Sequence, residues 1–136
     1  MLDYIIRKSD NKLYVARNNQ YQAYAMTFQK FINNMLLRRL SNLDALEKCS
    51  RKYFSLKSKI PLLLSKDILL LCVVSYRMLN SIYINYLSIS KYVRDKNSII
   101  VYFNSGHCLK INNVYAFLKQ YKLARKIIDR FSDLDF

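Results

Sequence analysis

The chain has 136 residues, of which 52% are hydrophobic, so it can build one domain with its own core and is too short for two comfortable ones. This composition argues against a disordered basic tail. Lysine and arginine number 23 against 9 aspartate and glutamate residues, and the resulting net charge of +14 exceeds what solubility alone requires. We therefore expect a single domain over residues 1–136 with a polyanionic partner such as a nucleic acid.

The first 26 residues contain three short strand-like runs, which are separated by polar residues that favour turns. The runs are Tyr4 to Arg7, Lys12 to Arg17 and Tyr21 to Met26, and their spacing predicts a meander. From Thr27 the apolar residues recur at helical spacing. A helix capped by Thr27 is therefore expected to run to about Leu40.

A second helix is expected after Ser41 or Asn42, with one apolar face and one basic face. Basic side chains at the end of the first helix, on the second helix and just after it could neutralise phosphates or reach into a groove. These candidate DNA-binding residues are Arg38, Arg39, Lys48, Arg51, Lys52, Lys57 and Lys59. The alternative interpretation of the same residues is an ordinary solvated helical surface.

A β region is expected from Ile60 to Ile111. The apolar stretch from Ile60 to Val74 is interrupted by a polar Ser-Lys-Asp step, so it predicts a core hairpin and is too short to span a bilayer. Pro61 fits a strand start or a sheet edge. Alternation on both sides of Asn104-Ser105-Gly106 predicts a further hairpin over Ile99 to Ile111.

The last predicted element is an amphipathic helix capped by Asn112 or Asn113, with Phe117 and Ala124 in its apolar stripe. Its outer face carries Lys119, Lys122, Arg125 and Lys126, which are interpreted as a solvated face. The fold class is therefore α+β. We expect an antiparallel sheet, open or barrel-like, of about six or seven strands, with two inserted helices and a C-terminal amphipathic helix.

No set of residues suited to catalysis or metal binding is found in the sequence. The only histidine, His107, is expected in a hairpin turn with no motif around it, and the single glycine excludes a Gly-rich phosphate loop. Cys49, Cys72 and Cys108 are odd in number and widely spaced, which fits neither a disulfide framework nor a zinc site. We expect a cytoplasmic protein that is not an enzyme and has no metal, no cofactor and no small-molecule substrate.

The order of motifs resembles the ComK family of competence transcription factors. That family has a Lys-Pro-Ile strand, a second apolar strand, a Trp-Ile-Asn strand, a hairpin turning on Asn-Gly and a helix. The matching segments here are Lys59 to Pro61, Ile68 to Val74, Ile82 to Asn85 and Ile99 to Ile111, with Tyr83 in place of the tryptophan. Upstream, the strand at Tyr4 to Lys8 is similar to the family's opening strand, and Phe28 to Phe54 takes the place of its basic helical middle.

The resemblance implies a sequence-specific activator of competence genes that binds AT-rich paired boxes in double-stranded DNA, largely through the minor groove, as a homo-oligomer. Narrow A-tract grooves attract arginine, which is consistent with roles for Arg38, Arg39 and Arg51. Two alternatives stay open. One is a basic interaction module for anionic lipid or an acidic protein, and the other is a LytTR-like DNA-binding domain, which the Ile84-Asn85-Tyr86 strand and the following hairpin resemble.

Overall fold

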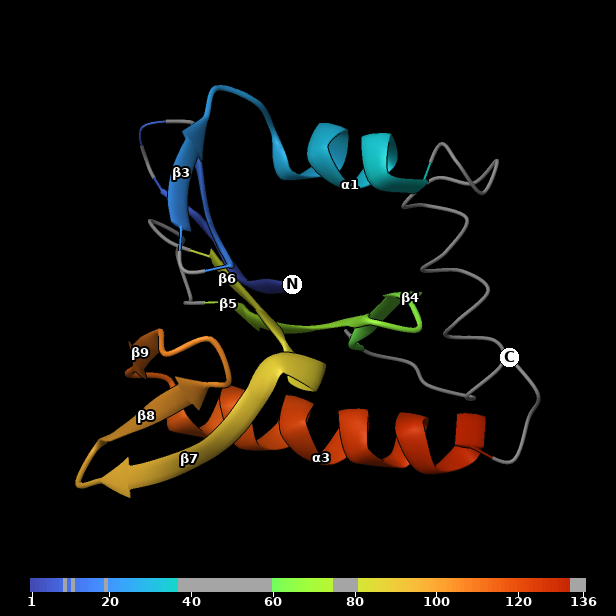
Figure 1. Cartoon of the computed structure of the whole chain (residues 1–136). Coiled ribbons are helices and arrows are strands. Elements are labelled where there is room, and N and C mark those ends of the chain that lie inside the picture. The colour runs from blue at the N-terminus through green and yellow to red at the C-terminus, as the bar shows by residue number, and fades with distance from the viewer. Residues whose placement is uncertain (9, 11, 19, 37–59, 75–80, 133–136) are drawn as a thin grey trace.

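The computed structural model describes residues 1–8, 10, 12–18, 20–36, 60–74 and 81–132 (Figure 1). These ranges contain nine strands and two α-helices, and the strands form two antiparallel sheets. The predicted α+β class is confirmed. Both sheets are open, so the barrel-like form is not found in the described part of the chain.

The larger sheet has six strands in the order β3-β2-β1-β6-β5-β4. Its strands are β1 (Leu2–Arg7), β2 (Leu13–Arg17), β3 (Gln20–Tyr24), β4 (Leu62–Ser65), β5 (Ile68–Val74) and β6 (Ser81–Asn85). The predicted meander is β1 to β3, and the predicted core hairpin is β4 and β5. Pro61 directly precedes β4, where its missing N–H removes no ladder bond.

The smaller sheet has three strands in the order β7-β8-β9. Its strands are β7 (Ile89–Asp95), β8 (Ser98–Phe103) and β9 (Cys108–Ile111), so the predicted hairpin over 99–111 is confirmed. The sequence analysis did not single out β7. Asn85 caps the 3₁₀ turn η2 (Tyr86–Ser88), through which the chain passes from the first sheet to the second.

The two helices begin where capping residues predict. Helix α1 (Phe28–Leu36) starts after Thr27, whose Oγ1 accepts a 3.1 Å hydrogen bond from the backbone N–H of Lys30. Helix α3 (Val114–Ser132) starts after Asn113, whose Oδ1 accepts from the N–H of Ala116 at 3.1 Å. The expected end of the first helix near residue 40 and the expected second helix lie outside the described residues.

The elements stack in layers around the six-stranded sheet. Helix α1 covers one face, and α3 with the small sheet covers the other (Figure 1). The run Ile68–Val74 is apolar throughout because β5 is buried on both faces: Leu70 and Cys72 join the α1 side, whereas Leu69 and Leu71 join the α3 side. The sheet therefore separates two hydrophobic cores.

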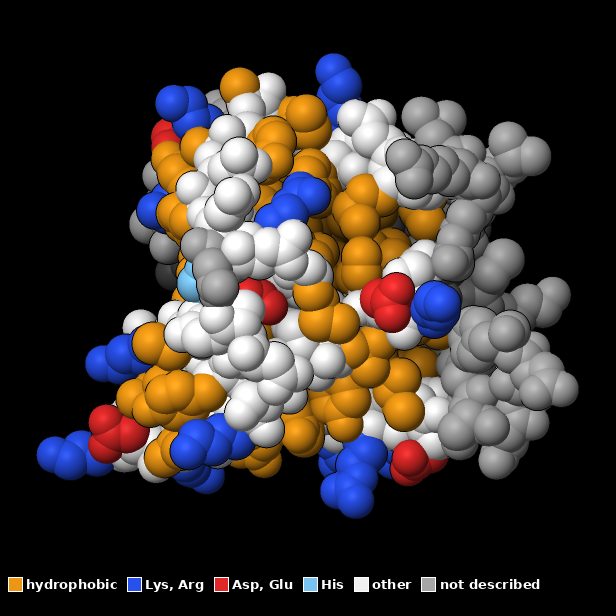
Figure 2. Space-filling model, in the orientation of Figure 1, with side chains coloured by type: hydrophobic (Ala, Val, Ile, Leu, Met, Phe, Trp, Pro, Cys, Tyr) orange, Lys and Arg blue, Asp and Glu red, His pale blue; other side chains and the backbone are white. Residues whose placement is uncertain are grey.

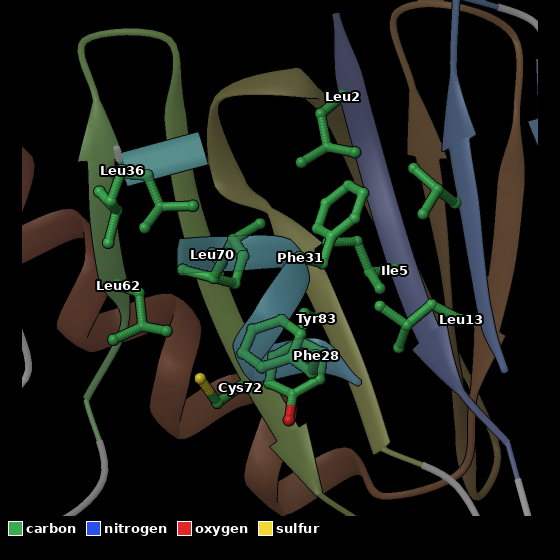
Figure 3. Packing of buried hydrophobic residues seen from close by; sticks show 13 residues of the cluster. Leu2, Ile5, Leu13, Phe28, Phe31, Leu36, Leu62, Leu70, Cys72 and Tyr83 are labelled. Atoms are coloured by element: carbon green, nitrogen blue, oxygen red, sulfur yellow. The ribbon is translucent and has the colours of Figure 1, made fainter. Parts of the chain in front are cut away.

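The core under α1 is held by aromatic stacking. The Phe28 ring lies flat on the Tyr83 ring, with centroids 3.7 Å apart and an interplanar angle of 9° (Figure 3). Phe31 points from the same helix toward Leu2 and Ile5 of β1 (Figure 3). This packing fixes α1 across β1, β6 and β5.

Two buried amides complete the backbone bonding of the sheet. The Asn85 side chain is fully buried, and its Oδ1 accepts from the N–H groups of Leu69 and Leu87 at 3.0 and 3.2 Å. Its Nδ2 donates to the carbonyls of Leu2 and Asp67 at 2.8 and 3.1 Å. All four hydrogen-bonding positions of this amide are therefore satisfied.

The second amide is that of Gln120 on α3, whose Oε1 accepts from the N–H of Cys72 at 3.1 Å. Extending the β4–β5 register by two residues places Cys72 opposite Ile60, just before Pro61, where the ladder has ended. The helix thus supplies the acceptor that β4 does not. This bond and the apolar contacts of Phe117 and Ala124 dock α3 against the large sheet.

Candidate nucleic-acid interface

The seven basic residues that the sequence analysis proposed for DNA binding all lie between residues 37 and 59, outside the described residues. Their sequence context is nevertheless informative. The segment holds those seven bases and only two acids, Asp44 and Glu47, and it directly follows α1. It therefore contributes about a third of the net charge, five of fourteen, from 23 residues.

Helix α3 presents the most concentrated basic surface of the described residues. Its buried stripe includes Phe117, Gln120, Ala124 and Ile127, which turn the opposite side of the helix to solvent. The exposed side carries Tyr115, Lys119, Lys122 and Lys126, which recur at spacings of four, three and four residues and hence share one face. We call these four residues the helix face.

The helix face has features of a binding surface. Tyr115 is 77% exposed, the most exposed large hydrophobic side chain in the described part of the chain. Within that part, Lys119, Lys122 and Lys126 make no ion pair. The lysines span about 10 Å at 1.5 Å per residue, a length suited to several phosphates along a nucleic-acid backbone. The exposure of the lysines was predicted from the sequence, whereas that of Tyr115 was not.

A second basic surface lies on the outward side of the small sheet. In the register of β7, β8 and β9, Lys91 lies opposite Tyr102 and Lys110 lies opposite Ile100. The ammonium group of Lys91 lies 5.3 Å from the centre of the Tyr102 ring. Val93 is 45% exposed beside them. We call Lys91, Val93, Ile100, Tyr102, Cys108 and Lys110 the sheet face.

Charge on this side of the molecule is visible in the space-filling view. Lys and Arg side chains project from the lower part of Figure 2, where Figure 1 places β7 and α3. Among the described residues, β7 ends at the acidic residue Asp95, and α3 carries Asp129 near its end. Neither belongs to the helix face or the sheet face. The lysines of both faces therefore create positive potential on exposed surface.

A buried acid, Asp3, was missed by the sequence analysis. A β-bulge between Leu2 and Tyr4 places its side chain toward the small sheet, where Oδ2 lies 2.7 Å from Nδ1 of His107. Ser105 also donates its hydroxyl to this oxygen. His107 is thus not an isolated turn residue. The signal in the sequence was an acid inside the apolar strand Leu2–Arg7, but its partner lies far along the chain.

The geometry of this cluster favours a structural role. In a Ser-His-Asp nucleophilic triad, the serine bonds to one imidazole nitrogen and the carboxylate to the other. Here the Ser105 hydroxyl lies 3.4 Å from Nδ1 of His107, the same nitrogen that contacts Asp3. The serine is therefore not placed for activation by the imidazole. The three residues instead tie β1 to the β8–β9 turn.

The described residues hold no membrane-spanning helix and no cluster of metal ligands. No helix there is long and apolar enough to cross a membrane. Within the same ranges, no three histidine, cysteine or acidic residues gather as metal ligands. Cys72 is buried and Cys108 is exposed, whereas Cys49 lies outside the described residues.

Comparison with protein-family models gave no match, and comparisons with curated proteins and with solved structures gave none either.

Proposed function

We propose that the protein binds double-stranded DNA as a transcription activator similar to those of the ComK family. The observation that carries this proposal is the concentration of exposed lysines on the helix face, in a chain with a net charge of +14. Phosphate neutralisation by lysine and arginine supplies most non-specific DNA affinity. The order of the strands, the β8–β9 hairpin and the basic C-terminal helix α3 supports the family resemblance.

Specificity in this proposal comes from the segment 37–59. Arg38, Arg39 and Arg51 insert into the narrow minor groove of AT-rich boxes, while Lys48, Lys52, Lys57 and Lys59 contact phosphates. The helix face holds the flanking backbone. A homo-oligomer on paired boxes places one copy of these residues on each half-site. Activation of competence genes in the cytoplasm is the role that follows from the resemblance.

The test is fluorescence anisotropy of the full chain with two labelled duplexes of equal length across a salt series. One duplex carries two A-tract boxes, and the other is GC-rich. We expect tighter binding to the A-tract duplex at every salt concentration, with a second copy bound when both boxes are present. Equal affinities that vanish together as salt rises would contradict sequence-specific recognition.

Variants then locate the contacts. The double variant Arg38→Gln and Arg39→Gln should reduce the A-tract preference, whereas Lys30→Gln with Lys66→Gln should keep it after the same loss of charge. Lys30 and Lys66 are exposed and lie on α1 and the β4–β5 turn. If the duplexes are not distinguished, titration with vesicles of anionic and neutral lipid tests the basic interaction module instead.

A further inference from the structure

A cavity of about 600 Å³ lies between helix α1 and the large sheet. Its apolar lining includes Leu2, Phe31, Met35 and Ile68, and hydrophobic side chains are visible in the hollow between β3 and α1 (Figure 2). Phe31 extends from α1 toward Leu2 of β1 at this position (Figure 3). The volume falls in the range of pockets that hold small molecules.

Arginine is the one charged side chain among the described lining residues, which also include Asn18, Tyr24, Asn34 and the N-terminal Met1. Leu13, Val15 and Arg17 alternate on the side of β2 that faces α1, and the first two are buried core residues. The third position of that row is arginine, which also lines the cavity. Its guanidinium lies 6.0 Å from the centre of the Phe31 ring. An apolar residue would continue the core, so arginine here requires another explanation.

The guanidinium of Arg17 is incompletely bonded. Its Nε is buried and has no hydrogen-bond partner, alone among the buried side-chain nitrogen and oxygen atoms of the described residues. An unmade hydrogen bond at a buried charged group is costly, so such groups are normally paired. The described residues that line the cavity include no carboxylate. Among the described lining residues, Arg17 thus offers an unbonded Nε donor and a positive charge that no carboxylate neutralises.

We propose that this cavity binds a small carboxylate with an apolar chain, of the fatty-acid class, with Arg17 holding the carboxylate. The Nε and one terminal nitrogen of a guanidinium form a fork that matches the two oxygens of a carboxylate. The apolar chain then lies against Leu2, Phe31 and Met35. This site is separate from the helix face and the sheet face and does not depend on DNA binding.

The experiment is calorimetric titration of the full chain with dodecanoate below its micelle concentration, beside dodecanol as the uncharged analogue. We expect one dodecanoate per chain and much weaker binding of dodecanol. Methionine-methyl NMR gives the location, because Met26 and Met35 line the cavity and their signals should move on binding. Equal binding of the alcohol, or unmoved methyl signals, would overturn the proposal.

Variants separate this site from general attraction to a basic protein. Arg17→Gln should weaken dodecanoate about tenfold or more, the loss typical of a hydrogen bond to a charged group. Arg94→Gln removes an equal charge from the exposed strand β7 and should leave affinity within about twofold. Met35→Trp should block binding by filling the cavity. Equal losses in both arginine variants, or undiminished binding in the tryptophan variant, would refute the assignment.

Discussion

The carboxylate of Asp3 and the imidazole of His107 are in contact at 2.7 Å, between Oδ2 and Nδ1, although 104 residues separate them in the sequence. Asp3 is 1% exposed, and its partner is 22% exposed. The contact joins the first strand of the large sheet to the turn of the β8–β9 hairpin. Because a buried carboxylate without partners is costly, the two sheets hold each other in place through this pair.

Removal of the Asp3 charge should therefore destabilise the fold. We expect Asp3→Asn to lower the free energy of unfolding by about 1.5–3 kcal/mol, the value of a buried hydrogen bond to a charged group. Urea unfolding of this variant, of His107→Ala and of the double variant gives the coupling energy. Additive effects of the two single changes would show that the pair contributes no coupling. Asp95→Asn, on the exposed strand β7, is the matched control.

Replacement of Asn85 should have a larger effect. In Asn85→Leu, a side chain of similar size leaves the N–H of Leu69 and the carbonyls of Leu2 and Asp67 without their amide partner. We expect a loss of about 3 kcal/mol or more in urea unfolding, since each unsatisfied buried group costs about 1–3 kcal/mol. Asn112→Leu makes the same chemical change at an exposed position and should stay within about 0.5 kcal/mol. Similar losses in both variants would argue against the role of the buried amide.

Local sequence patterns predicted the elements that have a capping residue or a hydrophobic pattern of their own. Thr27 marks the start of α1, and the apolar run in β5 reflects burial on both faces. Strand β7 was not predicted, because six of its seven residues are exposed and its sequence therefore has no hydrophobic alternation. Its strand conformation depends on pairing with β8. The role of Asn85 was likewise not predictable from local pattern, because its amide bonds to Leu2, which is far away in the sequence.

The candidate site was less predictable than the fold. Exposure of Lys119, Lys122 and Lys126 follows from helical periodicity, but the same periodicity is expected of any solvated helix. Their significance rests on the exposed Tyr115 beside them and on their lack of ion pairs with other described residues, and neither feature can be predicted from periodicity. The cavity beside Arg17 could not be predicted from the sequence either. Arginine is common at the end of a strand, and the other residues that line the cavity come mostly from distant parts of the chain.

The titration of Tyr4 should lower the free energy of unfolding at alkaline pH. Burial raises the pKa of Tyr4 above its ordinary value of 10.0, with further contributions from Tyr21, Asp3 and Cys108. The unfolded chain then loses this proton at lower pH than the folded chain, so the stabilisation is present below pH 10 and lost as pH rises through the folded pKa. Urea unfolding between pH 8 and pH 11 should show a shallower decline for Tyr4→Phe. An unchanged pH dependence would exclude Tyr4 as its source.

The N-cap of α1 offers a smaller and cleaner test. Thr27→Ala removes the acceptor of the Lys30 N–H, and we expect a loss of about 1 kcal/mol in the free energy of unfolding. Thr27→Ser keeps the hydroxyl and should retain nearly all of that stability. Equal destabilisation by serine and alanine would mean that the threonine methyl group matters and the cap does not.

The helix face makes a quantitative prediction about DNA binding. Each neutralised phosphate contributes about 0.9 to the slope of log affinity against log salt. If Lys119, Lys122 and Lys126 each contact one phosphate, their combined replacement by glutamine should reduce that slope by about 2 to 3. Replacement of Lys30, Lys66 and Lys96 removes the same charge from three exposed positions elsewhere and should change the slope little. Anisotropy titrations over a salt series measure both slopes, and equal reductions in the two triple variants would mean that net charge, and not this face, binds the backbone.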